Sequence, residues 1–373
     1  MDTNLFNKLC GILENYNFSG KVKEINPITI GHINDTFTVE YIEEDETEKK
    51  YLLQRINHNV FKKPVEVMEN IVGVTEFIKK KIALNGGDTE REVLTVFKTK
   101  KGENHVITES GDHWRVYNFV DNSFSLNEVT SKEDFKVAAV AFGNFQKQLA
   151  DYPIETLKET IPNFHNTVSR FADFKTALAE NKSGRKNEAE KEIEFALARE
   201  QDCSVITSLL DSGELPLRVT HNDTKLNNVL FDEKTKKPLC IVDLDTVMPG
   251  SSLYDFGDSI RFGANTGKED EKDLSKISLD LELFKAYVEG YLEAAGSSLT
   301  ENEIKYLPFS AKLLTFECGI RFLADFINGD VYFKTEYPEH NLVRARTQFK
   351  LVEDIEAKFE EMESIVNQAK SRG

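Results

Sequence analysis

The sequence predicts an α+β fold of two lobes, a small N-terminal lobe built on an antiparallel sheet and a larger, mainly helical C-terminal lobe. Near the N-terminus, residues 28–41 alternate between apolar and other side chains with the period of two that is typical of strands. Beyond residue 131 the apolar side chains instead recur three or four positions apart, as on one face of an amphipathic helix. The change of period places the boundary near residue 120, so we expect lobes at residues 1–120 and 121–373.

The N-terminal lobe is expected to begin with a short amphipathic helix that ends before Gly20. A hairpin with its turn at residues 31–35 follows, and residues 50–56 form a third strand. Pro64 opens a helix that reaches about Ile82, because proline is favoured in the first helical turn. The remaining strands of this lobe are expected at residues 92–98, 105–108 and 113–120.

The C-terminal lobe is expected to begin with a helix that Ser131 caps and that runs to Ala150. Helical, highly charged segments continue from there to Pro216. Residues 228–231 and 239–242 read as two short strands that form a hairpin. Further helices are predicted at residues 284–294, 307–328 and 344–368.

The 373 residues carry 47 Lys and Arg against 64 Asp and Glu, a formal net charge of −17. This acidic excess argues against a nucleic-acid partner and against binding to an anionic membrane surface. The four cysteines lack metal-type spacing and are expected to be reduced thiols. No basic-then-apolar leader begins the chain, and no apolar run reaches the roughly 18 residues of a membrane span, so we expect a soluble, cytoplasmic protein.

One central stretch of the chain carries the strongest chemical signal. His221, Asp223 and Asn228 fit H-x-D-x-x-x-x-N, the kinase catalytic-loop pattern in which Asp accepts the proton of the attacking hydroxyl and Asn binds magnesium. Asp243 follows twenty residues after Asp223, at the end of an apolar run. Phosphoryl transfer needs an aligned nucleophile and cations that neutralise developing charge. We therefore predict a phosphotransferase site with Asp223 as the base and Asn228 and Asp243 as Mg²⁺ ligands, which the hairpin would bring together.

Two nearby motifs resemble other catalytic signatures. Residues 255–257 spell the Asp-Phe-Gly of protein kinases, but they begin 32 residues after the catalytic aspartate and follow a Pro-Gly turn, whereas Asp243 has the spacing of a metal ligand. We interpret Asp255 as a structural brace for the catalytic loop. Residues 257–259 resemble the nucleophile block of a serine esterase, which needs a base for its serine. The only histidine downstream is His340, and the aspartate that such esterases place before it is missing.

The nucleotide is expected to lie against the N-terminal lobe. Gly31, in the turn of the hairpin, would let backbone N–H groups approach a phosphate. Gln54 stands where other kinases carry a phosphate-binding lysine, so the neighbouring Arg55 or another cation is expected to supply the positive charge. The backbone from Asn118 to Val120 is expected to bond the adenine at the hinge between the lobes.

These features, in this order, resemble the aminoglycoside phosphotransferase and choline kinase superfamily, whose fold is protein-kinase-like. A closer resemblance, to the N-acetylhexosamine 1-kinases of bacteria, extends over nearly the whole chain, and Gln54 in place of lysine is similar to that family as well. The resemblance rests on GHIN at 31–34, WRVY at 114–117, LRVTHNDTKLNN at 217–228, DLDT at 243–246, FGDSIRFGA at 256–264, ECGIRFLAD at 317–325 and YPEHNLVR at 337–344.

The resemblance implies a kinase that uses ATP and Mg²⁺ to phosphorylate the anomeric C1 hydroxyl of N-acetylglucosamine or N-acetylgalactosamine. It also implies His32, Arg321 and Tyr332 as sugar contacts, with Asp223 at the reacting hydroxyl. The residues alone predict only a small-molecule kinase, so an aminoglycoside, choline, homoserine or other sugar kinase stays open, as does a binding protein without catalysis. For Arg321 the alternative is a surface ion pair with Asp325, four positions further along its helix.

Overall fold

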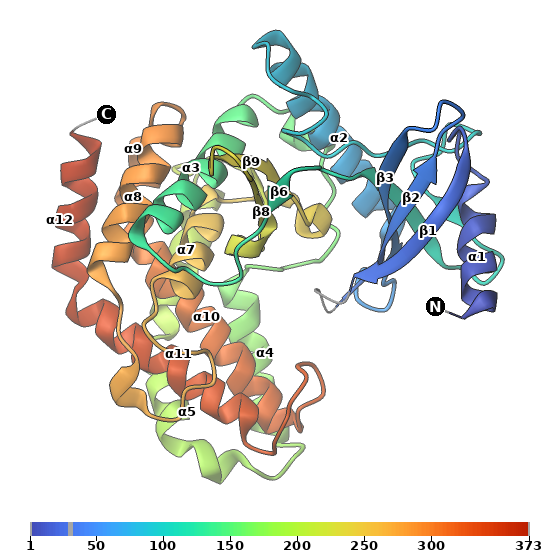
Figure 1. Cartoon of the computed structure of the whole chain (residues 1–373). Helices are drawn as coiled ribbons and strands as arrows, with labels where there is room; N and C mark the ends of the chain where they lie inside the picture. Colours follow the sequence, from blue (N-terminus) through green and yellow to red (C-terminus); the bar gives the residue numbers. More distant parts are fainter. Residues whose placement is uncertain (1, 29–32, 372–373) are drawn as a thin grey trace. The chain divides into compact units, whose positions relative to one another are not determined.

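The computed structural model describes residues 2–28 and 33–371 and divides into two compact units (Figure 1). Unit 1 comprises Met1–Phe124, Asp151–Ile161 and Leu230–Met248, and unit 2 comprises Ser125–Ala150, Pro162–Val229 and Pro249–Gly373. These units are defined by compactness, not by what they bind. The division into a nucleotide-binding and an acceptor-binding lobe near residue 120 therefore stays a prediction.

Unit 1 is built on a five-stranded antiparallel sheet, as predicted. Each strand pairs with its neighbour in the order β1-β2-β3-β5-β4, so the only departure from sequence order is the exchange of the last two strands. The strands are β1 (Lys21–Ile28), β2 (Asp35–Ile42), β3 (Glu48–Ile56), β4 (Val106–Ile107) and β5 (His113–Asn118).

The two faces of this sheet have different characters, because successive side chains of a strand point to opposite sides. On one face, Leu53 of β3 and Trp114 of β5 pack with helix α1 (Thr3–Leu13) in a hydrophobic cluster. The other face carries Gln54 and Arg115, and the Arg115 guanidinium approaches Met68 of helix α2 (Pro64–Leu84). A polar face beside a long helix is thus built into unit 1.

The predicted strand at residues 92–98 is wrong. Only an isolated bridge joins Val96 to Tyr117 of β5. The reason is the Asn118 side chain, whose Oδ1 accepts the Thr95 N–H at 2.6 Å and whose Nδ2 donates to the Glu90 carbonyl at 2.8 Å. Such bonds to a side chain offer this segment an alternative to ladder pairing and hold it in an irregular path.

The predicted hairpin before Asp243 is confirmed. Strands β8 (Val229–Asp232) and β9 (Pro238–Ile241) are neighbours in a small sheet that also contains β6 (Ser123–Phe124). Asp232 organises the turn, because its carboxylate accepts the backbone N–H of Thr235 at 2.7 Å. These two paired strands therefore connect the catalytic-loop motif, which ends at Asn228, to Asp243.

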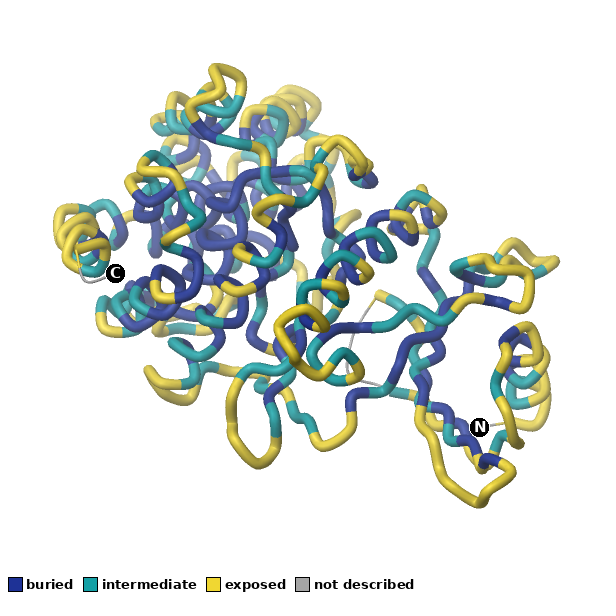
Figure 2. Tube along the Cα trace, turned by 90° about the horizontal axis from the view of Figure 1, so that it is seen from above, coloured by how far each residue is buried: buried dark blue, intermediate teal, exposed yellow. Residues whose placement is uncertain are grey.

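Unit 2 is mainly helical, and Figure 2 shows buried residues gathered in the middle of its helices. Helix α7 and helix α10 approach closely at Gly257, where an added Cβ would lie 2.4 Å from the Ser310 carbonyl oxygen, so only glycine fits there. A short strand, β7 (Arg218–Thr220), pairs with β10 (Met248–Gly250). The helices are α3 (Lys132–Gln148), α4 (Thr167–Glu180), α5 (Glu190–Leu197), α6 (Val205–Asp211), α7 (Ser252–Gly263), α8 (Leu281–Ala295), α9 (Glu301–Lys305), α10 (Leu307–Asn328), α11 (His340–Ala357) and α12 (Phe359–Lys370).

The single helix predicted at residues 344–368 is in fact two, α11 and α12, which meet at Lys358. The Lys358 ammonium donates to Asp354 Oδ2 at 2.7 Å and to the Leu279 carbonyl at 2.8 Å. These bonds tie the break to the segment before α8, and α12 packs against α8. Tertiary contacts, which sequence periodicity does not report, thus end the first helix.

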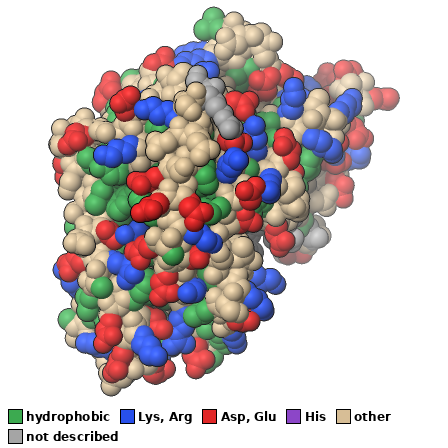
Figure 3. Space-filling model, turned by 90° about the vertical axis from the view of Figure 1, so that its left-hand side faces the viewer, with side chains coloured by type: hydrophobic (Ala, Val, Ile, Leu, Met, Phe, Trp, Pro, Cys, Tyr) green, Lys and Arg blue, Asp and Glu red, His purple; other side chains and the backbone are tan. Residues whose placement is uncertain are grey.

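Acidic and basic side chains share the face of the molecule that Figure 3 shows. On the face drawn in Figure 3, acidic and basic side chains are interspersed, and neither sign gathers into one large patch. Among residues 2–28 and 33–371, no helix is both long and apolar enough to cross a bilayer.

Three histidines of unit 1 lie together and predict a pH-dependent stability. His113 Nδ1 lies 3.0 Å from His105 Nε2, and the His113 ring lies 6.4 Å from that of His58. Burial first, and then the neighbouring histidine, lower the pKa of both His105 and His113 below the ordinary value of 6.5. The unfolded chain therefore binds more protons than the folded chain as the pH falls below 6.5.

We accordingly expect the contribution of these histidines to the free energy of unfolding to be complete above pH 6.5. It should be lost as the pH falls through the lowered pKa values. Urea unfolding at several pH values between about 7.5 and 5 measures this dependence. The variant His105→Gln/His113→Gln should show a weaker dependence, because it lacks both titrating rings. Equal slopes in the wild type and the variant would contradict the prediction.

Candidate functional site

The catalytic loop of unit 2 follows β7 and carries Asp223. Asn222 adopts a left-handed conformation, with φ of 64°, which turns the chain sharply just before Asp223. The buried His221 ring lies against the rings of Phe142 and Phe145, at 5.8 and 6.0 Å between centroids. Its Nδ1 accepts the Asp223 N–H at 3.3 Å. His221 thus attaches the loop to α3 through its ring and fixes the backbone at Asp223 through its hydrogen bond.

Asp255 braces this loop, as the sequence predicted. Its Oδ2 accepts the His221 N–H at 2.9 Å, and its Oδ1 accepts the Asn222 N–H at 2.8 Å. Gln146 Nε2 donates a further bond of 2.9 Å to the same carboxylate. Burial raises the pKa of Asp255, while His221 and the three donors act in the opposite direction. A carboxylate surrounded by loop N–H groups is a structural support, not a metal ligand.

Asp223 is the one acid of the loop at residues 221–228, and 27% of its side chain is exposed. Its Oδ1 lies 2.8 Å from Lys225 Nζ, and the Asn228 amide nitrogen lies 3.3 Å from its Oδ2. Burial opposes the charge of Lys225, but Asp223 outweighs burial and raises the pKa of Lys225. A carboxylate beside a cation and an amide is suited to accept a proton while a phosphate is transferred nearby.

Asp243 belongs to unit 1, in the turn that follows β9. It has a left-handed backbone, with φ of 58° and ψ of 59°, and the 3₁₀ turn Leu244–Thr246 starts directly after it. Such a conformation costs free energy for any residue other than glycine and persists only where its surroundings hold it. The neighbouring Asp245 is 2% exposed.

Asp245 belongs to a polar network on the helix-α2 face of the sheet. Gln54 of β3 and Arg115 of β5 are directly opposite one another, and Arg115 Nε and Nη2 donate to Gln54 Oε1 at 2.9 and 2.5 Å. Arg115 Nη1 lies 2.5 Å from Asp245 Oδ1. Asn34 Nδ2 donates to Asp245 Oδ2 at 2.6 Å, and Gln54 Nε2 donates to Thr36 at 2.9 Å.

The structure places Arg55 on the opposite face of β3 from Gln54. Its guanidinium pairs with Asp35 at 2.5 Å and with Asp112 at 3.2 Å, and 36% of its side chain is exposed. Gln54 and Arg55 therefore cannot serve one ligand together. Glu69 of α2, the position from which a kinase glutamate would reach a phosphate-binding cation, is exposed and forms no ion pair within the described residues.

The segment expected to bind adenine uses some of its polar groups internally. The Asn118 side chain is bonded to Thr95 and Glu90, as described above, and the Val120 carbonyl accepts the Ser123 hydroxyl at 2.6 Å. Gly31 and His32 lie outside the described residues. Adenine recognition by this segment and phosphate recognition by the hairpin turn stay predictions.

Arg321 and Tyr332, the expected sugar contacts of unit 2, do lie together. The Arg321 guanidinium stands 5.9 Å from the ring centres of Tyr332 and Phe164, and 5.6 Å from that of Phe333. Within the described residues it makes no hydrogen bond and no close ion pair. The alternative pairing with Asp325 is absent there, because Asp325 accepts bonds from other donors. Those donors are the backbone N–H groups of residues 331, 332 and 333 and the Asn341 amide.

Arg321 connects to the catalytic loop through a buried dyad that the sequence did not single out. His165 Nδ1 lies 2.8 Å from Glu317 Oε1, and His165 Nε2 lies 3.5 Å from the Asn222 carbonyl, next to Asp223. Thr167 donates to the other oxygen of Glu317 at 2.7 Å. Burial opposes ionisation of Glu317, yet His165 and then Arg321 outweigh it and lower the pKa of Glu317. His165 and Glu317 are 152 positions apart, so only the fold brings them together.

The donors for a magnesium ion are hard oxygen atoms. In the part of the chain that the structure describes, no three His, Cys, Asp or Glu side chains gather as a metal site. A kinase Mg²⁺ instead uses one or two protein groups together with phosphate oxygens. Asn228 donates through Nδ2 to the Asp223 carbonyl at 2.8 Å, and its own carbonyl oxygen takes no part in that bond. Asn228 of unit 2 and Asp243 of unit 1 each carry an oxygen of the kind that such an ion binds. Their joint role as ligands stays a prediction.

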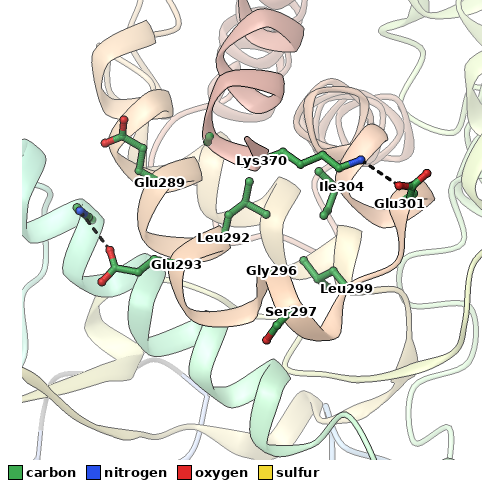
Figure 4. A pocket seen from close by; sticks show the side chains of 11 residues that line it. Glu289, Leu292, Glu293, Gly296, Ser297, Leu299, Glu301, Ile304 and Lys370 are labelled. Carbon is green, nitrogen blue, oxygen red and sulfur yellow. Dashed lines mark hydrogen bonds and ion pairs between the residues drawn. The ribbon is translucent and has the colours of Figure 1, made fainter. Parts of the chain in front are cut away.

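A pocket of about 680 Å³ also opens in unit 2, beside α8, α9 and α12 (Figure 4). Leu292 and Ile304 belong to its apolar lining, and Lys370 Nζ pairs with Glu301 Oε1 at its rim over 3.3 Å. None of its lining residues is a candidate catalytic or acceptor-binding residue. The reaction is therefore not assigned to this pocket.

Comparison with known proteins agrees with this chemistry. The profile of the phosphotransferase enzyme family matches residues 24–296. Among solved structures, a microcompartment-associated aminopropanol kinase is 14% identical with a TM-score of 0.56, covering 96% of this chain and 98% of that chain. Choline kinase from Cryptosporidium parvum Iowa II is 14% identical with a TM-score of 0.57, covering 98% and 99%. Amicoumacin kinase in complex with AMP-PNP and Ca²⁺ is 14% identical with a TM-score of 0.57, covering 94% and 93%.

At these identities the likeness to solved structures shows the fold alone. It confirms the predicted α+β, kinase-like fold class.

Proposed function

The chain belongs to the phosphotransferase enzyme family, and from this premise we propose that it is an ATP-dependent N-acetylhexosamine 1-kinase. In this proposal it transfers the terminal phosphate of ATP, in line, to the anomeric C1 hydroxyl of a 2-acetamido sugar. Asp223 accepts the proton of that hydroxyl, and Asn228 and Asp243 hold Mg²⁺. The ion, when bound with ATP, neutralises the charge that develops on the phosphate.

The loop geometry supports Asp223 as the base. Asp223 is partly exposed, whereas Asp255 is buried and bonded on both oxygens. The ammonium of Lys225 lies 2.8 Å from the Asp223 carboxylate, so the one acid of the loop stands beside a cation. The same ammonium is placed to compensate negative charge on the transferred phosphate. Proton acceptance and charge compensation thus come from one short loop.

The observation that carries the acceptor assignment is the positive charge beside that loop. Arg170 Nε and Nη2 donate to the Phe164 carbonyl at 3.1 and 3.0 Å, and the Arg321 guanidinium lies 5.9 Å from the Phe164 ring, so both guanidinium groups approach the same residue. Burial and, after it, Arg321 lower the pKa of Arg170. The buried Glu317 is a single carboxylate that interacts electrostatically with both Arg170 and Arg321. A cationic acceptor such as choline, ethanolamine or an aminoglycoside would be repelled here, because like charges disfavour each other at short range. A neutral polyol is not, and the unbonded fork of Arg321 can donate to its hydroxyl and acetamido oxygens.

The aromatic rings around Arg321 fit the same acceptor. Phe164, Tyr332 and Phe333 surround the guanidinium, and 68% of Tyr332 is exposed. A pyranose has apolar C–H faces that pack on such rings while its hydroxyl groups meet polar atoms. His32 belongs to the proposed sugar site from the resemblance in sequence alone.

An acceptor panel with ATP and Mg²⁺ tests the proposal directly. Turnover should be greatest with N-acetylglucosamine or N-acetylgalactosamine and small with choline, ethanolamine, homoserine and kanamycin. The product should show phosphorus coupling on its anomeric proton in NMR. Phosphate on C6, or preferred turnover of an amine-bearing acceptor, would contradict the proposal. Either result would assign the enzyme a different acceptor specificity within the family.

Arg321→Ala should raise the KM for the sugar by roughly 10- to 100-fold, the size expected for lost bonds from a charged donor. The KM for ATP should hardly change, because the contact lies on the acceptor side of the transferred phosphate. Steady-state kinetics with each substrate varied in turn measure both constants.

Arg346→Ala is the matched control, since the Arg346 side chain is half-buried and, within the described residues, forms its ion pair with Glu192, at 2.7 Å. It should leave both constants unchanged. An Arg321→Ala enzyme with a normal sugar KM would remove Arg321 from the acceptor site.

A further inference from the structure

Strand β3 carries Gln54 where other kinases have a phosphate-binding lysine. Another cation of unit 1 is therefore expected to act at the nucleotide site. Gln54, at that position, is neutral, and Arg55 points to the other face of the sheet. A cation that does lie on the face of Gln54 is Arg115, which stands directly opposite it on the adjacent strand β5. The guanidinium thus lies one strand away from the expected lysine position, and Gln54 Oε1 accepts its hydrogen bonds.

All three nitrogens of the Arg115 guanidinium approach a polar partner. Nε and Nη2 donate to Gln54 Oε1, and Nη1 pairs with Asp245 at 2.5 Å, so the guanidinium joins the sheet to the turn after β9. The other oxygen of Asp245 accepts the Asn34 amide at 2.6 Å. Asn34 Oδ1 in turn accepts the Asn57 N–H at 2.9 Å, which ties the network to the chain after β3.

Stability alone does not explain this arrangement. Arg115 and Asp245 side chains are each 2% exposed, and a buried ion pair costs so much desolvation that apolar residues of similar size commonly serve as well. The pair does, however, hold one defined geometry. The held segment is the turn that begins at Asp243, whose left-handed backbone needs such support.

We propose that Arg115 is a positioning residue of the nucleotide site: acting through Asp245, it fixes the 243–246 turn so that the Asp243 carboxylate meets the cation carried by the nucleotide phosphates. Gln54 holds the guanidinium in register. Asp245 is then a structural partner and not a second metal ligand. The proposal rests on the phosphotransferase role of Asp243 and is independent of which acceptor the enzyme uses.

The test is the affinity for ATP, measured calorimetrically without any acceptor, once with Mg²⁺ and once with EDTA. Arg115→Gln should weaken binding of Mg²⁺–ATP by roughly 10- to 100-fold, the usual effect of removing a group that orients a metal ligand. Binding of metal-free ATP should change far less. Asp245→Asn should show the same pattern. Arg55→Gln, an equally conservative change on the opposite face of the sheet, should leave both affinities unaltered.

A double variant keeps the test decisive if either single change damages folding. Arg115→Gln/Asp245→Asn leaves no unpaired buried charge, so it is expected to fold, which circular dichroism and a thermal melt verify. Its Mg²⁺–ATP affinity should equal that of the single variants, because residues that act through one contact are not additive. A double variant with wild-type Mg²⁺–ATP affinity would make the pair merely structural. An equal loss with and without Mg²⁺ would instead make Arg115 a direct phosphate contact, and either result overturns the proposal.

The two proposals fail in different experiments. The acceptor panel tests the acceptor assignment, and the calorimetric dissociation constants, measured without a sugar, test the role of Arg115.

Discussion

Asp223→Asn is expected to lower kcat by roughly 10²- to 10⁴-fold, the usual contribution of a positioned general base. The substitution keeps the shape of the side chain and removes only its ability to take up a proton. It also removes the partner of Lys225, but that pair is partly exposed, at 41% and 27%, and contributes little to stability. Nucleotide affinity and the melting temperature should therefore stay close to the wild-type values.

Single-turnover kinetics with saturating Mg²⁺–ATP isolate the chemical step in this variant. Asn227→Ala is the control, since Asn227 lies exposed in the same loop. Turnover by Asp223→Asn close to that of the wild type would assign the proton to another group.

Asp255→Ala and Asp243→Ala should fail in different ways, although both remove one acid of the same region of sequence. Asp255→Ala leaves the backbone N–H groups of His221 and Asn222 without this acceptor in a buried site, and Gln146 Nε2 keeps only its bond to the Val219 carbonyl. Each unsatisfied donor costs about 1–3 kcal/mol, so we expect unit 2 to lose on the order of 3–5 kcal/mol of stability. Asp243→Ala should instead leave the melting temperature nearly unchanged and weaken the binding of Mg²⁺–ATP, because it removes a hard oxygen ligand.

Thermal melts combined with calorimetric titration of ATP in Mg²⁺ separate the two effects. A stable Asp255→Ala protein that no longer binds Mg²⁺–ATP, beside an unstable Asp243→Ala protein, would exchange the roles that we give to the two acids. Asp255→Asn refines the result, since an amide retains one acceptor oxygen and should lose less stability than alanine does.

The sequence by itself determined the class of the protein and the order of its parts. Periodicity located the antiparallel sheet and most helices, because apolar spacing directly reports which face of an element is buried. The spacing of Asp223, Asn228 and Asp243 predicted phosphotransferase chemistry, and the family profile agrees. Asp255 could be interpreted correctly as a brace because its distance from the loop excluded the ligand position.

The tertiary structure decided what depends on pairing between distant residues. Strand register placed Arg115 opposite Gln54, which no local pattern reports. The position of Arg55 on the other face, by contrast, follows from the alternation of side chains along a strand. The one visible signal was a charged residue in the middle of an otherwise largely apolar strand, within residues 113–118. The irregular path of residues 92–98 likewise follows from a single side chain, Asn118, whose bonds outweigh a favourable strand pattern.

The same limit applies to the acceptor side. His165 and Glu317 form a dyad next to the catalytic loop, although 152 positions separate them. Asp325 accepts bonds from the loop at 331–333 instead of pairing with Arg321, which leaves that guanidinium available for a ligand. A buried charge must find partners, but the sequence does not say which, because the free energy of each pair depends on distances that only the folded chain sets.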